Sequence, residues 1–153
     1  MEPRYMRPTI PNFSTKKGKE TMSTFRSVEE AREYFKNDQF AYRAGMELAE
    51  LGDDYAVCAV PIHEVLYNAN GGIQGGAIFT LADLAFAALA NHLHMPTVAQ
   101  QVSVNFLSTP KGTRLTARAE LKKNGRATCV INVSVTDDTG RDVAQYVGIG
   151  FKC

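Results

Sequence analysis

The sequence lacks an excess of either charge. Its 153 residues include 17 Lys and Arg against 16 Asp and Glu. A chain so balanced has no overall field that would draw in nucleic acid or an anionic membrane, so neither is expected as a partner. Any anionic ligand has to be held by local charge.

Cysteine is scarce, and patterns of export or membrane insertion are missing. Cys58, Cys129 and Cys153 form no Cys-x-x-Cys pair, so we expect free thiols and no disulfides. No uninterrupted apolar run reaches the length of a membrane span, and the first residues lack the apolar core of a secretory signal. These absences favour a cytoplasmic location.

Motifs for nucleophilic and nucleotide chemistry are also missing. There is no Gly-x-Ser-x-Gly elbow, no P-loop and no dinucleotide fingerprint. His92 and His94 stand close together, but no third ligand lies at a spacing that would complete a metal site. The sequence therefore predicts no metal and no other cofactor.

What is present suffices for one globular domain. Hydrophobic residues make up 44% and charged residues 22% of the chain, an ordinary balance for a globular protein. Residues 1–26 contain three prolines, a Lys-Lys-Gly-Lys run and few large apolar residues, which predicts a poorly ordered arm. The domain is expected to occupy residues 27–153.

Periodicity predicts one long helix among strands. Ser27 and Glu30 form a capping box, which predicts a first helix from residue 27. The stretch 76–91 is rich in Ala and Leu and has few polar residues, as in a buried helix. Alternating patterns predict strands at 45–51, 54–61, 97–107, 113–123, 127–137 and 142–152. Because only the sheet can bury the long helix, we expect an α+β fold whose antiparallel sheet wraps around it.

The start of the long helix suits a developing negative charge. The N–H groups of Gly75 and Gly76 lack carbonyl partners within the helix, and glycine lets a substrate atom approach the backbone closely. The helix N-terminus also carries partial positive charge. These features predict an oxyanion site for acyl transfer, although a glycine pair also serves simple packing of helix on sheet.

Asp83 is the one carboxylate in this apolar helix. A buried charge is costly unless it is paired or functional, so Asp83 is a candidate catalytic group, with a structural role as the alternative. Gly75 lies eight residues earlier, about 12 Å along a helix, whereas both groups must come within about 3 Å of one reacting carbonyl. Antiparallel pairing of two subunits would bring Asp83 beside the neighbour's Gly75, which predicts a homodimer with two shared sites.

The stretch 68–83 resembles a known family. Asn68, Gly71, Gly75-Gly76 and Asp83 fall at the spacing N-x-x-G-x-x-H-G-G-x-x-x-x-L-x-D, the motif of the PaaI-like branch of the hot-dog thioesterases. The stretches VSVNFLSTP and NGRATCVINVSVTDDTGRDVAQYVGIGF are similar to that branch too. The resemblance implies a hot-dog fold, hydrolysis of acyl-coenzyme A (acyl-CoA) thioesters, and assembly as a dimer or tetramer.

The resemblance also implies roles for single residues. Asp83 would act as base or nucleophile, the Gly75 N–H would polarise the thioester carbonyl, and Asn68 would help to hold that carbonyl or a water. Gln74 stands where the family usually has His; it keeps a donor and an acceptor but carries no proton near neutral pH. Gln74 and Gly76 are expected to line the substrate site.

A basic turn is a candidate clamp for the CoA phosphates. Lys122, Lys123 and Arg126 flank the turn at Asn124 and Gly125. A solvated hairpin tip would look the same, but the resemblance at Gly125 and Arg126 favours phosphate binding.

Two functions stay open. The first is hydrolysis of a small or aromatic acyl-CoA to free acid and CoA. The second is a catalytically silent hot-dog protein that binds acyl-CoA as a sensor or scaffold. Gln74, in place of the family's usual His, is the feature that supports this alternative. A related dehydratase fits less well, because that activity relies on a His and an acidic partner that this motif does not supply.

Overall fold

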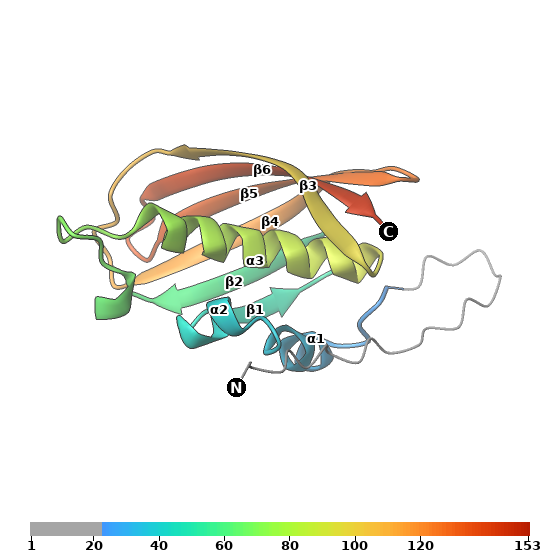
Figure 1. Ribbon diagram of the computed structural model, residues 1–153, viewed down its shortest axis with the longest axis horizontal. Coiled ribbons are helices and arrows are strands. Elements are labelled where there is room, and N and C mark those ends of the chain that lie inside the picture. Colours follow the sequence, from blue (N-terminus) through green and yellow to red (C-terminus); the bar gives the residue numbers. More distant parts are fainter. Residues whose placement is uncertain (1–22) are drawn as a thin grey trace, which may run out of the picture.

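The long helix α3 (Gly75–Leu93) lies against a six-stranded antiparallel sheet that curves around it (Figure 1). The computed structural model describes residues 23–153. The other elements are α1 (Val28–Phe35), α2 (Gln39–Arg43), β1 (Glu47–Leu51), β2 (Tyr55–Pro61), the 3₁₀ turn η1 (Glu64–Leu66), β3 (Thr97–Phe106), β4 (Arg114–Asn124), β5 (Thr128–Asp137) and β6 (Asp142–Lys152).

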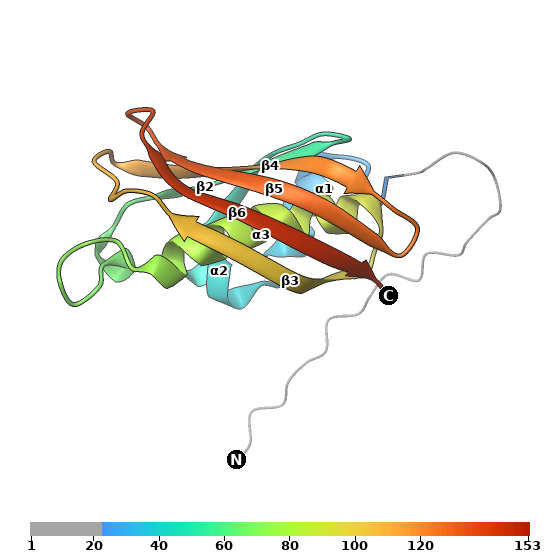
Figure 2. The same cartoon turned by 90° about the horizontal axis from the view of Figure 1, so that it is seen from above.

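The strand order β1-β2-β4-β5-β6-β3 makes β1 and β3 the edges of the sheet. All neighbouring strands are antiparallel. Figure 2 shows the long strands crossing over α3 on one side, while α1 and α2 lie near β1 (Figure 1). The expected α+β hot-dog fold is confirmed.

Composition explains why α3 lies in the core. It is rich in Ala and Leu, which favour helices, and residues such as Leu81, Phe86 and Leu89 are buried. By length and composition α3 is apolar enough to cross a membrane, but 56% of that stretch is buried inside the fold. This is the situation of a core helix.

Most element boundaries lie within two residues of those expected from the sequence. The helix expected at 76–91 begins at Gly75 and ends at Leu93. The short helix α2 was not predicted; Asp38 caps it by accepting a hydrogen bond from the N–H of Ala41 at 3.1 Å.

Only half of the predicted capping box forms at α1. Ser27 Oγ accepts from the N–H of Glu30 at 3.2 Å. The Glu30 carboxylate accepts from the N–H of Arg26 at 2.8 Å instead of reaching Ser27. Ser27 is therefore the N-cap and α1 begins at Val28, while the Glu30 carboxylate binds the backbone of Arg26, the residue before the cap.

The beginning of the described chain packs against the end of α3. Phe25 is buried, and its ring centroid lies 5.5 Å from that of Tyr34 and 6.1 Å from that of His92. The N–H of Thr24 donates to the carbonyl of His92 at 2.8 Å. The packing thus extends to Thr24, while residues 1–22 of the expected arm lie outside the described residues.

The cysteines are free thiols, as the sequence indicates. Cys58 and Cys129 are buried in strands, and Cys153 is exposed. Burial raises the pKa of both buried thiols. Neither is a reactive thiolate near neutral pH.

Asn91 joins the end of α3 to the start of β3. Its amide donates to the carbonyl of Thr97 at 3.2 Å and accepts from the N–H of Thr97 at 3.0 Å. From there β3 returns along α3, so that the ring of Phe106 lies against Gly75, where a Cβ would be 3.4 Å away. The start of α3 and the end of β3 therefore meet at one end of the molecule.

Candidate active site

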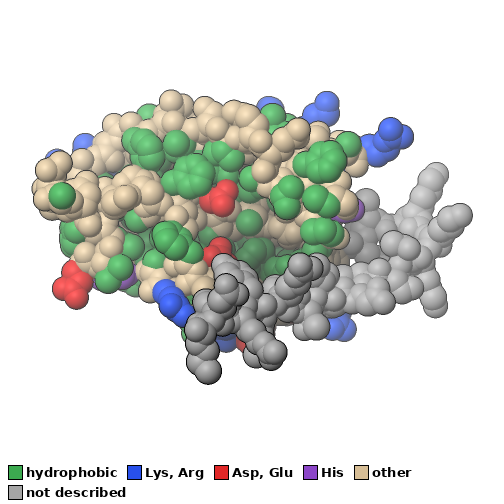
Figure 3. Space-filling view, in the orientation of Figure 1, with side chains coloured by type: hydrophobic (Ala, Val, Ile, Leu, Met, Phe, Trp, Pro, Cys, Tyr) green, Lys and Arg blue, Asp and Glu red, His purple; other side chains and the backbone are tan. Residues whose placement is uncertain are grey.

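One face of α3 is only partly covered by the sheet. It carries Gly76, Thr80, Asp83 and Ala87, spaced as successive turns of one helix face, and none of these is fully buried. Figure 3 shows isolated acidic side chains among hydrophobic ones on the side where α3 runs. Asp83 is the carboxylate that α3 contributes to this face.

The first turn of α3 keeps one backbone donor, the Gly75 N–H, that is unpaired among the residues described. Gln74 caps the helix, its Oε1 accepting from the N–H of Gly76. The N–H of Ala77 donates to the Gln74 carbonyl at 2.9 Å. The Gly75 N–H donates to no group within residues 23–153. Since the helix N-terminus is also partly positive, Gly75 can donate to a developing oxyanion.

Asn68 shapes the loop that leads into α3. Its Oδ1 accepts from the N–H groups of Asn70 at 2.9 Å and Gly72 at 3.1 Å, and Gly71 has the positive φ of 77° that this tight loop requires. Within residues 23–153 its Nδ2 makes no hydrogen bond and lies near the Gly72 backbone. The oxygen of Asn68 therefore serves the loop, and the amide nitrogen stays free to donate.

Asp83 has a partner that sequence reasoning did not find. The hydroxyl of Tyr146, on β6, donates to Asp83 Oδ1 at 2.7 Å. Burial, and next the hydrogen bond to Asp83, raise the pKa of Tyr146, so the phenol stays protonated as a donor. No short sequence pattern predicts this pair. Tyr146 lies 63 residues after Asp83, in a strand where it looks like any other apolar residue of the alternation.

One chain does not bring Asp83 and Gly75 together. Both lie in the continuous helix α3, eight residues and thus about 12 Å apart along its axis. A shared site between two chains therefore stays the prediction for a complete centre. The structure brings Asn68, Gln74, Gly75 and Gly76 together at the helix start.

Gly125 and Arg126 lie far from the start of α3 in the same chain. They sit in the turn between β4 and β5, which spans residues 125–127 and is longer than a two-residue turn. Lys152 Nζ donates to Asn124 Oδ1 at 2.5 Å and to the Gly125 carbonyl at 2.7 Å. Arg126 is exposed and forms no ion pair within the described part of the chain. Because Lys152 pairs with Thr97, this turn lies near the end of α3, far from Gly75 of the same chain.

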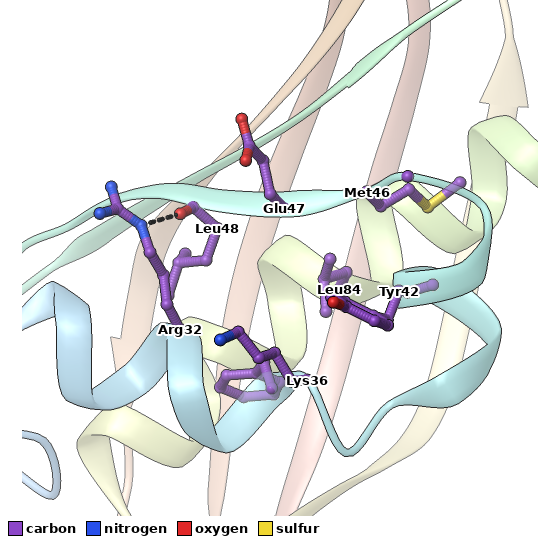
Figure 4. Close-up of a pocket in the computed structure, with 10 residues that line it drawn as sticks. Arg32, Lys36, Tyr42, Met46, Glu47, Leu48 and Leu84 are labelled. Carbon is purple, nitrogen blue, oxygen red and sulfur yellow. Dashed lines mark hydrogen bonds between the residues drawn. The ribbon is translucent and has the colours of Figure 1, made fainter. Parts of the chain in front are cut away.

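A cavity of about 380 Å³ lies on another side of α3, between α1, α2 and β1 (Figure 4). Arg32 closes part of its wall by donating to the carbonyls of Leu48 and Ala49, each at 2.6 Å. Leu84 is the contribution of α3. Because consecutive helix residues turn by about 100°, Leu84 faces this cavity while Asp83 faces Tyr146. The cavity can hold an apolar group next to the open face of α3.

Sequence comparison finds a superfamily and two related proteins whose names are those of ester or thioester hydrolases. The family model of the thioesterase superfamily matches residues 70–144. The acyl-coenzyme A thioesterase PaaI of Escherichia coli is 28% identical over 119 residues, which are 77% of this chain and 85% of that protein. A putative esterase of Deinococcus radiodurans is 31% identical, over 71% of this chain and 75% of its own length.

Solved structures agree in fold. The E. coli PaaI structure superposes with a TM-score of 0.76 at 25% identity, covering 82% of this chain and 91% of that one. A hypothetical thioesterase protein from Streptococcus pneumoniae, solved with coenzyme A, superposes with a TM-score of 0.70 at 30% identity, covering 76% of this chain and 94% of that one. With this fold and these relatives, the chain belongs to the thioesterase superfamily.

Proposed function

We propose that this protein hydrolyses the thioester of a small or aromatic acyl-CoA to the free acid and CoA. The observation that carries the proposal is the Gly75 N–H at the start of α3, which has no acceptor within residues 23–153, in a chain whose partly exposed helix face presents Asp83. The N–H stabilises the oxyanion that forms on the thioester carbonyl. Asp83 either takes a proton from the attacking water or attacks the carbonyl itself.

The centre is completed by a second copy of the chain. β3 is an edge strand of ten residues, Thr97–Phe106, with neither a charged residue nor proline. Natural edge strands usually carry such residues to prevent pairing, so β3 is suited to pair with another β3. A two-fold axis makes this pairing antiparallel and can place Asp83 beside the partner's Gly75.

The basic turn then belongs to the subunit that supplies Asp83. In one chain the turn at Gly125 and Arg126 lies beyond Asp83 toward the end of α3, on the side away from Gly75. A long CoA molecule whose thioester lies at Asp83 and the partner's Gly75 can extend toward this turn. Arg126 would bind its phosphates, since guanidinium groups pair well with phosphate.

The cavity beside α3 supports a small or aromatic acyl group. Its volume of about 380 Å³ lies near the lower end of ligand pockets. Phe35, Tyr42, Met46 and Leu84 form an apolar part of its lining, beside the charged residues Arg32, Lys36 and Glu47. An acyl group held there would lie beside Leu84, which follows Asp83 in α3 and points to a different side of the helix.

Gln74 fits this function as the cap that occupies the Gly76 N–H. A silent acyl-CoA-binding protein is the contrasting outcome, and nothing in the geometry of Asp83 favours it. Assembly beyond a dimer and a cytoplasmic location stay predictions.

Thiol release from a panel of acyl-CoAs tests the proposal. We expect turnover by the wild type and a loss of at least 100-fold in Asp83→Asn and Asp83→Ala. Binding of acyl-CoA without thiol release, unaffected by Asp83→Ala, would instead identify a sensor.

A further inference from the structure

Tyr146 is held so that its hydroxyl has little freedom. The residue is fully buried in the middle of β6, between Val104 of β3 and Val133 of β5 in the sheet register. Its ring centroid lies 5.7 Å from that of Phe79 and 5.9 Å from that of Phe86. Side chains from α3 therefore flank the ring that contacts Asp83.

Gly148 provides the space for this arrangement. A Cβ at Gly148 would lie 2.6 Å from the Phe86 ring and 2.9 Å from the Tyr146 ring. Any side chain there forces both rings to move, because a packed core leaves them no free volume. The position of the Tyr146 hydroxyl thus depends on the packing of β6 against α3.

The two oxygens of Asp83 are unequal as a result. Oδ1 accepts from Tyr146 at 2.7 Å, a good length for a hydroxyl donor. Within residues 23–153, Oδ2 accepts no hydrogen bond. A donor on one oxygen also restricts rotation of the carboxylate, which reduces the orientations available to the other oxygen.

We propose that Tyr146 is a positioning residue: it fixes Asp83 through Oδ1 and leaves Oδ2 as the oxygen that meets the substrate or the attacking water. This inference rests on the proposed function, in which Asp83 is the reacting group. Tyr146 does not touch the substrate. It acts through Asp83, and both belong to one chain.

A double-mutant cycle tests the proposal. Tyr146→Phe removes the hydroxyl and keeps the ring, so we expect kcat for acyl-CoA hydrolysis to fall about 10- to 100-fold with KM within twofold of the wild type. In the Asp83→Asn background the same change should alter the residual rate less than twofold, because there is no carboxylate left to position. A structural role for Tyr146 would lower activity in both backgrounds.

Two further variants sharpen the test. Tyr55→Phe is the matched control, since Tyr55 stacks with Arg118 on β4 at 4.5 Å and its hydroxyl loss should leave kcat unchanged. Gly148→Ala keeps the Tyr146 hydroxyl but displaces the ring, so it too should lower kcat with little change in KM. If Tyr146→Phe does not unfold in a cooperative thermal transition, its kcat is no test, and Gly148→Ala then tests the positioning role instead.

The outcomes separate the two proposals. An active wild type, an inactive Asp83→Asn variant and an unchanged kcat in folded Tyr146→Phe overturn only the positioning role. Equal losses from Tyr146→Phe with and without Asp83 overturn it as well. A wild type that hydrolyses no acyl-CoA overturns the proposed function, and the positioning role falls with it.

Discussion

Gln74 accepts, through its side-chain Oε1, the hydrogen bond of the Gly76 N–H, and this cap leaves Gly75 as the donor at the start of α3 that has no acceptor in the described part of the chain. The N–H groups of Ala77 and Ile78 already donate to the Gln74 carbonyl at 2.9 and 3.3 Å. Gln74, which stands where the PaaI-like motif has His, therefore organises the helix start through hydrogen bonds and without a side chain that titrates near neutral pH.

Gly75→Pro removes this donor while keeping the helix. Proline is favoured at the first helical position, and Gln74 already has φ −64° and ψ 127°, a conformation that suits a residue before proline. We expect thiol release to fall about 100- to 1000-fold, with a melting temperature close to that of the wild type.

Gly75→Ala is the control for that change. It keeps the N–H, and its Cβ would meet the Phe106 ring at 3.4 Å, an ordinary contact. Its activity should exceed that of Gly75→Pro by at least tenfold. Equal losses in the two variants would mean that the N–H is not the donor.

The contrast between Gly75 and Tyr146 shows how far a sequence predicts such a site. Gly75, Gly76 and Asp83 belong to one helix, whose period and capping are local properties of the sequence. Tyr146 reaches Asp83 only because the register of β6 with β3 and β5 places it opposite α3. Such a contact depends on tertiary structure, so no pattern within a short stretch predicts it.

The fold was predictable where hydrophobic patterns were long. The four C-terminal strands and α3 have ten or more residues each, and their alternation or helical composition is unmistakable. Helix α2 has five residues and exposes Phe40, so it offers neither length nor an amphipathic pattern. It forms because Asp38 caps it.

Asp137 makes the stability of the fold depend on acid. Although buried, its carboxylate accepts from Thr139 Oγ1 at 2.6 Å and from the N–H groups of Lys111, Gly112, Thr139 and Arg141. The hydrogen bond from Thr139, followed by those from the backbone, lowers the pKa of Asp137 far below its usual value of 3.8.

A lowered native pKa predicts loss of stability in acid. The contribution of Asp137 is complete above about pH 5, where the same carboxyl group is also ionised in the unfolded chain, and it declines as the pH falls toward the depressed native pKa. Asp137→Asn should be less stable than the wild type at pH 7, and the gap should narrow between pH 4 and pH 2. Urea midpoints across this range measure it; a gap that is constant with pH contradicts the assignment.

Tyr42 is expected to limit the acyl group. It lines the cavity together with Met46 and Leu84. Tyr42→Ala enlarges the cavity, so the ratio of kcat/KM for a bulky acyl-CoA over a short one should rise about tenfold. Phe40→Ala is the matched control, because Phe40 is on the same helix but outside the cavity lining, and an equal change in both variants would place the acyl group elsewhere.

Arg126 is expected to bind CoA without taking part in the chemistry. Arg126→Glu should raise KM about tenfold or more and leave kcat within twofold, and the difference in KM should shrink at high salt. Arg43→Glu makes the same charge change on α2 and should leave KM unaltered. A fall in kcat with unchanged KM for Arg126→Glu would remove Arg126 from the phosphate site.

A mixture of two inactive variants tests the shared site. In a dimer of one Asp83→Asn chain and one Gly75→Pro chain, one site combines an intact Asp83 with the partner's intact Gly75, and the other site carries both changes. Random refolding of equal amounts makes half of the dimers mixed, so about a quarter of the wild-type activity should return. Mixing Asp83→Asn with the Asp83→Asn/Gly75→Pro double variant should return none. If the first mixture also stays inactive while mixed dimers are present, then Asp83 and Gly75 do not act across two chains.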